Sequence, residues 1–131
     1  MTDKELVNLS QEAAEKAYAP YSGFTVGAAL LCKSGRVYQG CNIENAAYSP
    51  TNCAERTAFF KAISEGEIEF EAIAIVGGKD RDFREYCTPC GVCRQVMQEF
   101  CDESFRIILG KSNGEIKVCT LGELLPCSFK L

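Results

Sequence analysis

Residues 71–77 read Glu-Ala-Ile-Ala-Ile-Val-Gly, an almost uninterrupted apolar run. A run of this length is typical of a β-strand that is buried on both faces, as in the middle of a parallel or mixed sheet. We therefore expect residues 71–77 to form a central strand, and the rest of the fold to be arranged around it.

The residues before this run predict one helix followed by a hairpin. Thr2 and Glu5 have the spacing of a capping box, and apolar residues then recur at intervals of three and four until Pro20. Strands are expected at 24–32 and 37–43, joined by a turn. The connection between the helix and the first strand, rich in turn-forming residues and tyrosine, could be a plain loop or a lid.

Helices and strands also alternate around and after the central run. We expect a helix at 53–64, capped by Thr51 or Asn52, and a second helix that starts with Pro89 in its first turn and ends near Phe100. Further elements are expected at 105–109 (strand), 116–119 (strand) and 120–125 (short helix). This order predicts an α/β fold, a three-layer α/β/α arrangement with a mixed sheet of about five strands, formed by residues 1–131 as a single domain.

The composition excludes several classes of function. The chain has 131 residues and a net charge of −4, without the clustered basic residues of a nucleic-acid interface, so a small substrate is expected and no nucleic acid. No apolar run approaches the roughly 20 residues of a membrane span. The polar N-terminus does not resemble a secretory signal, so we expect a cytoplasmic protein with no membrane partner. An odd count of nine cysteines indicates metal binding or reduced thiols in preference to a disulfide framework.

Three of the cysteines have the pattern of an open zinc site. Cys90 and Cys93 are three apart at a probable helix start, and Cys53 stands at another. The positive end of a helix favours the thiolate that a metal needs. Three protein ligands are typical of a catalytic zinc, which keeps its fourth position for water. Two alternatives remain open: a closed structural zinc with Cys87 or Cys101 as fourth ligand, and an iron–sulfur cluster, which the ferredoxin spacing disfavours because a methionine stands at position 97.

Glu55, two residues after Cys53, is the candidate acid–base group. The chain contains no histidine, so proton transfer must fall to a carboxylate, a thiol, Lys, Tyr or water on a metal. The alternative is that Glu55 only completes a capping box with Asn52.

These motifs resemble a known family. Cys53-Ala54-Glu55-Arg56 with Pro89-Cys90-Gly91-Val92-Cys93 is similar to the signature of the zinc-dependent nucleoside and base deaminases. Together with residues 19–22 (Ala-Pro-Tyr-Ser), 24–29 (Phe-Thr-Val-Gly-Ala-Ala) and 42–45 (Asn-Ile-Glu-Asn), they resemble the small homotetrameric cytidine deaminases. The resemblance covers nearly the whole chain. Blasticidin-type deaminases are less similar, because they lack the Asn42 and Glu44 pair in this form.

The resemblance implies an activity, a cofactor and a set of site residues. It implies hydrolytic deamination of cytidine and deoxycytidine in pyrimidine salvage, by zinc-bound hydroxide with Glu55 as proton shuttle. One Zn²⁺ per subunit would be held by Cys53, Cys90 and Cys93, with Arg56 donating to the thiolate of Cys53. It also implies a homotetramer in which neighbouring subunits complete each site, and substrate contacts from Phe24, Asn42, Glu44, Tyr48, Ala54 and Phe129.

Overall fold

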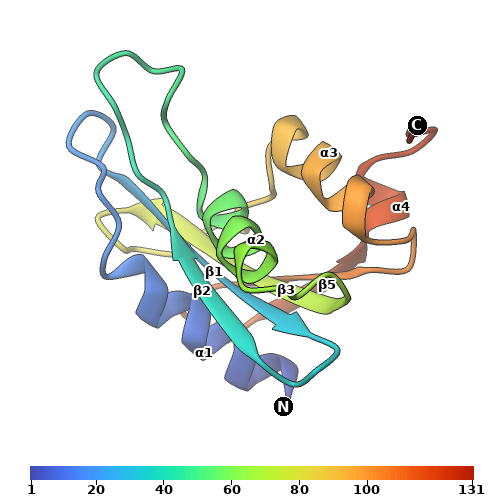
Figure 1. The fold of residues 1–131 in the computed structure, drawn as a ribbon. Coiled ribbons are helices and arrows are strands. Elements are labelled where there is room, and N and C mark those ends of the chain that lie inside the picture. The colour runs from blue at the N-terminus through green and yellow to red at the C-terminus, as the bar shows by residue number, and fades with distance from the viewer.

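The computed structural model describes all 131 residues, and a five-stranded mixed sheet forms its centre. The strand order is β2-β1-β3-β4-β5 (Figure 1). The predicted central strand is confirmed as β3 (Phe70–Lys79), the middle strand of the sheet. The other strands are β1 (Phe24–Cys32), β2 (Val37–Cys41), β4 (Arg106–Gly110) and β5 (Ile116–Thr120).

Strand direction follows from the connections. β3 and β4 are parallel, and the helix α3 (Gly91–Phe100) lies in the crossover between them. The pairs β1–β2, β1–β3 and β4–β5 are antiparallel, and short turns close the first and the last of these. The mixed sheet expected from the order of elements is therefore confirmed.

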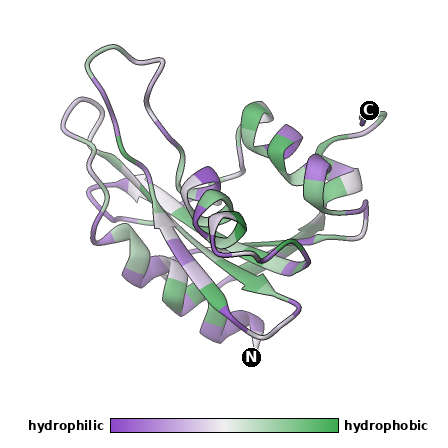
Figure 2. Ribbon diagram, viewed as in Figure 1, coloured by the Kyte–Doolittle hydropathy of each residue, from purple (hydrophilic) through white to green (hydrophobic).

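Helices cover both faces of the sheet (Figure 1). α1 (Asp3–Ala14) lies on one face, and α2 (Ala54–Ser64) and α3 lie on the other, with the short α4 (Leu121–Leu124) beside α3. Side chains of β3 alternate between two cores: Ile73 and Ile75 pack under α2 and α3, while Ala74 and Val76 pack against α1. Figure 2 shows hydrophobic residues along the central strands, which lie between helices that have one hydrophobic and one hydrophilic side. Because both faces of β3 are buried between its ends, its sequence has no polar side chain from Ala72 to Gly78.

Two glycines let the helices approach the sheet closely. A Cβ on Gly27 would lie 1.9 Å from the carbonyl oxygen of Ser10 in α1, and a Cβ on Gly40 would lie 2.3 Å from that of Ala54 in α2. The side chains of α2 that face β2 are correspondingly small, and these residues, Ala54, Ala58 and Ala62, are all fully buried. This close contact fixes the N-terminal end of α2, which carries Cys53 and Glu55.

Some expected boundaries are wrong by a few residues. Neither Thr51 nor Asn52 caps α2, and Pro89 is not in the first turn of α3; the cysteines Cys53 and Cys90 are the N-cap residues. Both have extended backbone angles, so each helix begins one residue later. The strand expected at 37–43 ends at 41. Separately, none of the helices combines the length and hydropathy that a membrane-spanning helix needs.

Candidate metal and active site

The thiols of Cys53, Cys90 and Cys93 converge at the N-terminal ends of α2 and α3. Their Sγ atoms all lie within 4.8 Å of one another. Those of Cys90 and Cys93 are 3.4 Å apart, and those of Cys53 and Cys90 are 3.8 Å apart. Neither Cys87 nor Cys101 belongs to this group, so the alternative of a closed site with a fourth cysteine ligand is not supported.

The spacing of the three sulfurs fits a tetrahedral zinc ion. A Zn–S bond of about 2.3 Å at tetrahedral angles separates neighbouring sulfurs by about 3.8 Å. The two observed separations lie at or slightly below this value. Thiolates are ligands that zinc prefers, and helix N-termini stabilise their negative charge. These residues could therefore hold a zinc ion with little rearrangement.

Arg56 lies against this cluster. Its Nη2 donates a hydrogen bond to Cys53 Sγ at 3.2 Å. Hydrogen bonds from Cys93, and then from Arg56 and Cys90, lower the pKa of Cys53 to about 5, against the opposing effect of burial. The Nε of Arg56 is buried and has no hydrogen-bond partner. The guanidinium therefore contributes positive charge to the site as well as its one hydrogen bond to Cys53. Cys53 is therefore the thiol best prepared to be a thiolate.

Glu55 is the one buried carboxylate of the chain, with only 4% of its surface exposed. The capping box with Asn52 does not form, because Asn52 precedes the cap and donates its amide to the Thr57 hydroxyl. Burial raises the pKa of Glu55 to about 7, and the negative charge of Cys53 adds to the rise. A carboxyl group with such a pKa can both accept and release a proton near neutral pH.

Cys87 and Phe24 both lie against Gly77 of β3. A Cβ on Gly77 would lie 2.6 Å from Cys87 Sγ and 3.1 Å from the ring of Phe24. Burial, and then the charge of Glu55, raise the pKa of Cys87 to about 12, so it stays a neutral thiol. The sequence suggested Cys87 only as a possible fourth zinc ligand, not as a neutral thiol beside Phe24. Phe24 is 42% exposed although it begins a core strand, which leaves its ring partly open to a ligand.

Asn42 and Glu44 both bond to the segment that enters β1. The Asn42 side chain donates to the Phe24 carbonyl at 2.8 Å and accepts from the Val26 N–H at 2.9 Å. Glu44 accepts from the loop just before, at residues 21–22. The two side chains therefore reach neighbouring parts of the same segment, residues 21–26.

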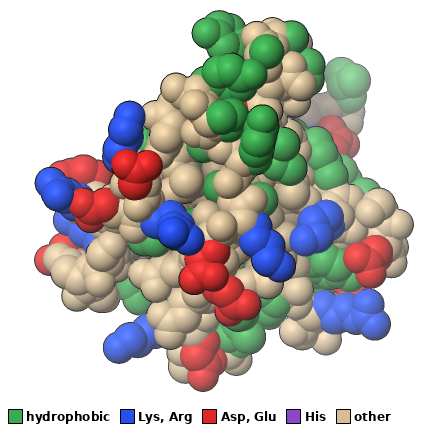
Figure 3. Space-filling model, turned by 90° about the vertical axis from the view of Figure 1, so that its left-hand side faces the viewer, with side chains coloured by type: hydrophobic (Ala, Val, Ile, Leu, Met, Phe, Trp, Pro, Cys, Tyr) green, Lys and Arg blue, Asp and Glu red, His purple; other side chains and the backbone are tan.

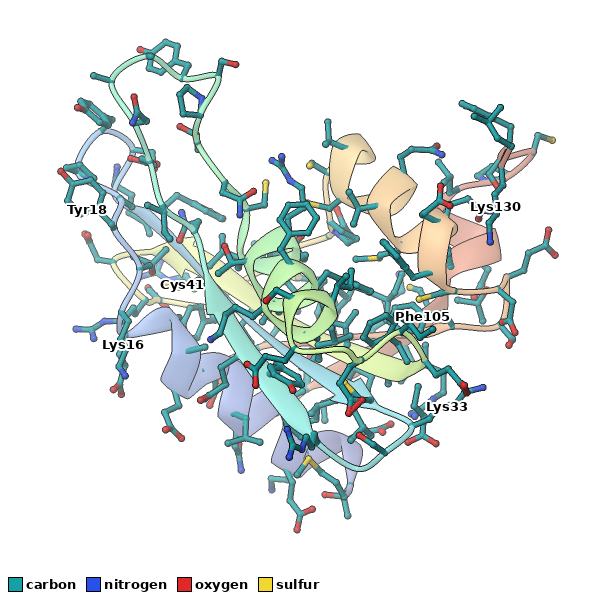
Figure 4. The ribbon with its side chains drawn as sticks, viewed as in Figure 1. Lys16, Tyr18, Lys33, Cys41, Phe105 and Lys130 are labelled. Carbon is teal, nitrogen blue, oxygen red and sulfur yellow. The ribbon has the colours of Figure 1, made fainter.

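Tyr48, Phe129 and Ala54 differ in exposure and location. Tyr48 is 77% exposed in the loop 42–52. Figure 3 shows hydrophobic side chains gathered at the upper end of the molecule. Phe129 is 69% exposed, its carbonyl accepts from Gln95 in α3, and Figure 4 shows this tail, marked by Lys130, across the molecule from Tyr18. Ala54 is fully buried against β2. Phe129 is therefore separated from the loops around Glu44 within one chain.

Comparison with known proteins agrees with this geometry. A family model described as the cytidine and deoxycytidylate deaminase zinc-binding region matches residues 1–109. The chain is 51% identical to the cytidine deaminase of Sporosarcina psychrophila over 129 residues, which cover 98% of this chain and 92% of that protein. It is 31% identical to the blasticidin-S deaminase of Bacillus cereus, over 97% of this chain and 91% of that one.

A solved structure has the same fold over the full length. The crystal structure of cytidine deaminase from Burkholderia pseudomallei superposes with a TM-score of 0.91 at 46% identity, and the match covers 98% of this chain and 100% of that one. The chain belongs to the cytidine and deoxycytidylate deaminase family.

Proposed function

We propose that this chain catalyses the hydrolytic deamination of cytidine and deoxycytidine, giving uridine or deoxyuridine and ammonia. The observation that carries the proposal is the convergence of three thiols beside a buried carboxylate, Glu55. Similarity over nearly the full chain to the cytidine deaminases of S. psychrophila and B. pseudomallei supports the substrate class.

The proposed metal ligands are Cys53, Cys90 and Cys93, with one zinc ion per chain. Zinc bound there lowers the pKa of a water molecule and so supplies a nucleophile at neutral pH. Arg56 would hold the thiolate of Cys53 in place and offset part of the charge of three sulfurs. The partial positive charge at the N-termini of α2 and α3 would also offset part of the negative charge of the thiolates.

Glu55 would move the protons of the reaction. It would take a proton from the attacking water and deliver it to N3 of the cytosine ring. In a second transfer it would move the proton of the new C4 hydroxyl to the amino group on C4, so that the C4–N bond breaks, ammonia leaves and the C4 carbonyl forms. Burial supports this role, because a carboxyl group shielded from solvent exchanges its proton with the substrate in preference to bulk water.

Recognition of the sugar would fall to Asn42 and Glu44, with Phe24 packing on the ligand. The Asn42 amide uses one of its two N–H groups on the Phe24 carbonyl, which leaves the other free. Ala54 is buried, so any contact with the substrate would come from its backbone. The ring of Phe24 is partly exposed and lies beside Cys87, whose pKa the charge of Glu55 raises.

We further propose a cytoplasmic homotetramer that acts in pyrimidine salvage, built from residues 1–131 as one domain. Tyr48 and Phe129 would complete the sites of neighbouring subunits. Their exposure supports this, because large apolar side chains that are open to solvent in one chain are typical of interfaces. The position of the tail, away from the loop 18–23 of its own chain, supports a contact in trans (Figure 4).

The direct test is the loss of cytidine absorbance when the zinc-loaded protein is added. We expect turnover of cytidine and deoxycytidine, loss of turnover with a chelator, and recovery when zinc is returned. Cytosine in an oligonucleotide should turn over far more slowly, since the chain carries a net charge of −4. A zinc-loaded protein that leaves both nucleosides unchanged would contradict the proposal.

A further inference from the structure

The loop 18–23, which joins α1 to β1, is fastened to the loop that carries Glu44. The Tyr18 N–H donates to the Asn42 carbonyl at 2.9 Å, and the Glu44 N–H donates to the Tyr18 carbonyl at 2.8 Å. The backbone at 18 therefore pairs in parallel with Ile43, outside the named strands. The two loops form one continuous wall at the end of the molecule where Figure 4 places Tyr18.

The carboxylate of Glu44 is held by three donors from this loop. Its Oε1 accepts from the N–H of Tyr21 at 3.0 Å and from the N–H of Ser22 at 3.2 Å. Its Oε2 accepts a short hydrogen bond from the Ser22 hydroxyl. A carboxylate has about four lone-pair sites, so about one remains, on Oε2, for a further donor.

Ser22 is itself fixed on all sides. Its hydroxyl accepts from the Phe24 N–H at 3.0 Å while it donates to Glu44. Its carbonyl accepts from Lys79 Nζ at 2.9 Å. The next residue, Gly23, has a φ of +69° and accepts from the Asp80 N–H at 2.9 Å. These contacts make the loop a support for Glu44 and do not favour the alternative of a lid.

A cavity lies directly beside this arrangement. It has a volume of about 420 Å³ and is lined by Tyr21, Ser22, Glu44, Asn45, Tyr48 and Thr51. An ionised carboxylate only accepts hydrogen bonds, so it selects a ligand that donates, such as the hydroxyl of a sugar. The tyrosine rings supply an apolar wall for the face of that ligand.

We propose that Ser22 is a positioning residue for sugar recognition, which holds the Glu44 carboxylate so that its remaining lone pair receives a hydroxyl of the nucleoside. The inference rests on the proposed function and adds to it a residue that acts through Glu44. The Ser22 hydroxyl is also the main cause of the lowered pKa of Glu44, ahead of the two backbone N–H groups. This bond favours the ionised form of Glu44, which accepts hydrogen bonds.

Steady-state kinetics of Ser22→Ala and Ser22→Thr test this role. For Ser22→Ala we expect KM for cytidine to rise about tenfold, the effect of losing one hydrogen bond to a charged group, while kcat changes less than about twofold. Ser22→Thr keeps the hydroxyl and should restore KM. With 1-methylcytosine, which has no sugar hydroxyl, wild type and Ser22→Ala should have the same kcat/KM.

A matched control exists at the opposite end of the sheet. Ser34 donates its hydroxyl to the Glu67 carboxylate at 2.7 Å in the turn between β1 and β2, so Ser34→Ala removes the same kind of bond far from the cavity. It should leave all kinetic constants unchanged. In a Glu44→Ala background, adding Ser22→Ala should cause no further rise in KM, since Ser22 then has no carboxylate to hold.

Three outcomes would overturn the inference: an unchanged KM in Ser22→Ala, an equal loss with 1-methylcytosine, or full additivity with Glu44→Ala. An inactive wild type would contradict the proposed function and not this inference. In that case calorimetric titration with uridine tests the role of Ser22, because Ser22→Ala should bind uridine about tenfold more weakly than wild type does.

Discussion

At the scale of single residues, the chemistry of the metal site depends most on the groups around Cys53. One thiol at the start of α2 receives a hydrogen bond from Arg56, and the pKa of that thiol falls to about 5. The Nε of this guanidinium is buried and makes no hydrogen bond within the chain. Partners of this kind tune how tightly a metal is retained.

Removal of Arg56 should therefore speed zinc loss. We expect Arg56→Ala to release zinc to a chromogenic chelator about 10–100-fold faster than wild type, because the Cys53 thiolate loses its donor. Arg56→Lys keeps a charge but not the planar geometry and should lie between the two. Arg36→Ala, at an exposed arginine of the β1–β2 turn, is the control. Equal release rates in Arg56→Ala and wild type would refute this role.

The site could be predicted from the sequence only in part. Cys53, Cys90, Cys93 and Glu55 are detectable because metal ligation and proton transfer demand particular residue types at short spacings, and the absence of histidine narrows the choice. Ser22 gave no such signal: its hydroxyl bonds to a carboxylate 22 positions away, and serine beside glycine is ordinary in a turn. Contacts of this kind depend on how two loops meet, which local patterns do not encode.

At the scale of elements, the close packing of α2 on β2 positions the chemistry. Gly40 allows the first turn of α2 to touch the strand, and Cys53 caps that same turn. The spacing of the alanines on one face of α2 can be seen in the sequence. The sequence does not show that this face packs closely enough on β2 to require glycine at position 40. The cysteine caps of α2 and α3 were missed because cysteine is not among the usual capping residues.

Gly40→Ala should weaken both folding and metal binding. An added Cβ would lie 2.3 Å from the Ala54 carbonyl oxygen and 2.6 Å from the Ala58 nitrogen, both backbone atoms. We expect a loss of about 3 kcal/mol in the free energy of unfolding, measured with urea at fixed protein and zinc concentrations. Zinc affinity should fall with it, since the clash displaces the turn that Cys53 caps.

Gly91→Ala is the matched control for this substitution. A Cβ there meets nothing within 4 Å, so its stability should equal or slightly exceed that of wild type, by up to about 1 kcal/mol. If Gly40→Ala were as stable as Gly91→Ala, the close approach of α2 to β2 would not limit the fold.

At the scale of the whole molecule, the residues proposed to contact the substrate lie in two separate parts of the chain. The loops 18–23 and 42–52 stand at one end, and the tail with Phe129 lies across the molecule (Figure 4). Apolar side chains are exposed at the upper end of the molecule in Figure 3. A neighbouring subunit would supply the missing walls, in agreement with the proposed homotetramer.

Subunit mixing tests this arrangement. Phe129→Ala should lower kcat/KM about tenfold by removing an aromatic contact with the substrate, while Glu55→Ala should be inactive. After subunits of the two variants exchange, activity should exceed that of either parent, because Phe129 from one subunit completes a site whose Glu55 belongs to the other. Activity no higher than the average of the parents would show that Phe129 does not act in trans.

The central claim is that a buried carboxylate beside three zinc-binding thiols moves the protons of cytidine deamination. Glu55→Gln tests it most directly, because it keeps the volume and burial of the side chain and removes only its ability to exchange a proton. The account predicts one zinc per chain in both proteins and a kcat in the variant that is lower by about 10²–10⁴-fold. A zinc-loaded Glu55→Gln variant that converts cytidine to uridine at the wild-type rate would contradict it.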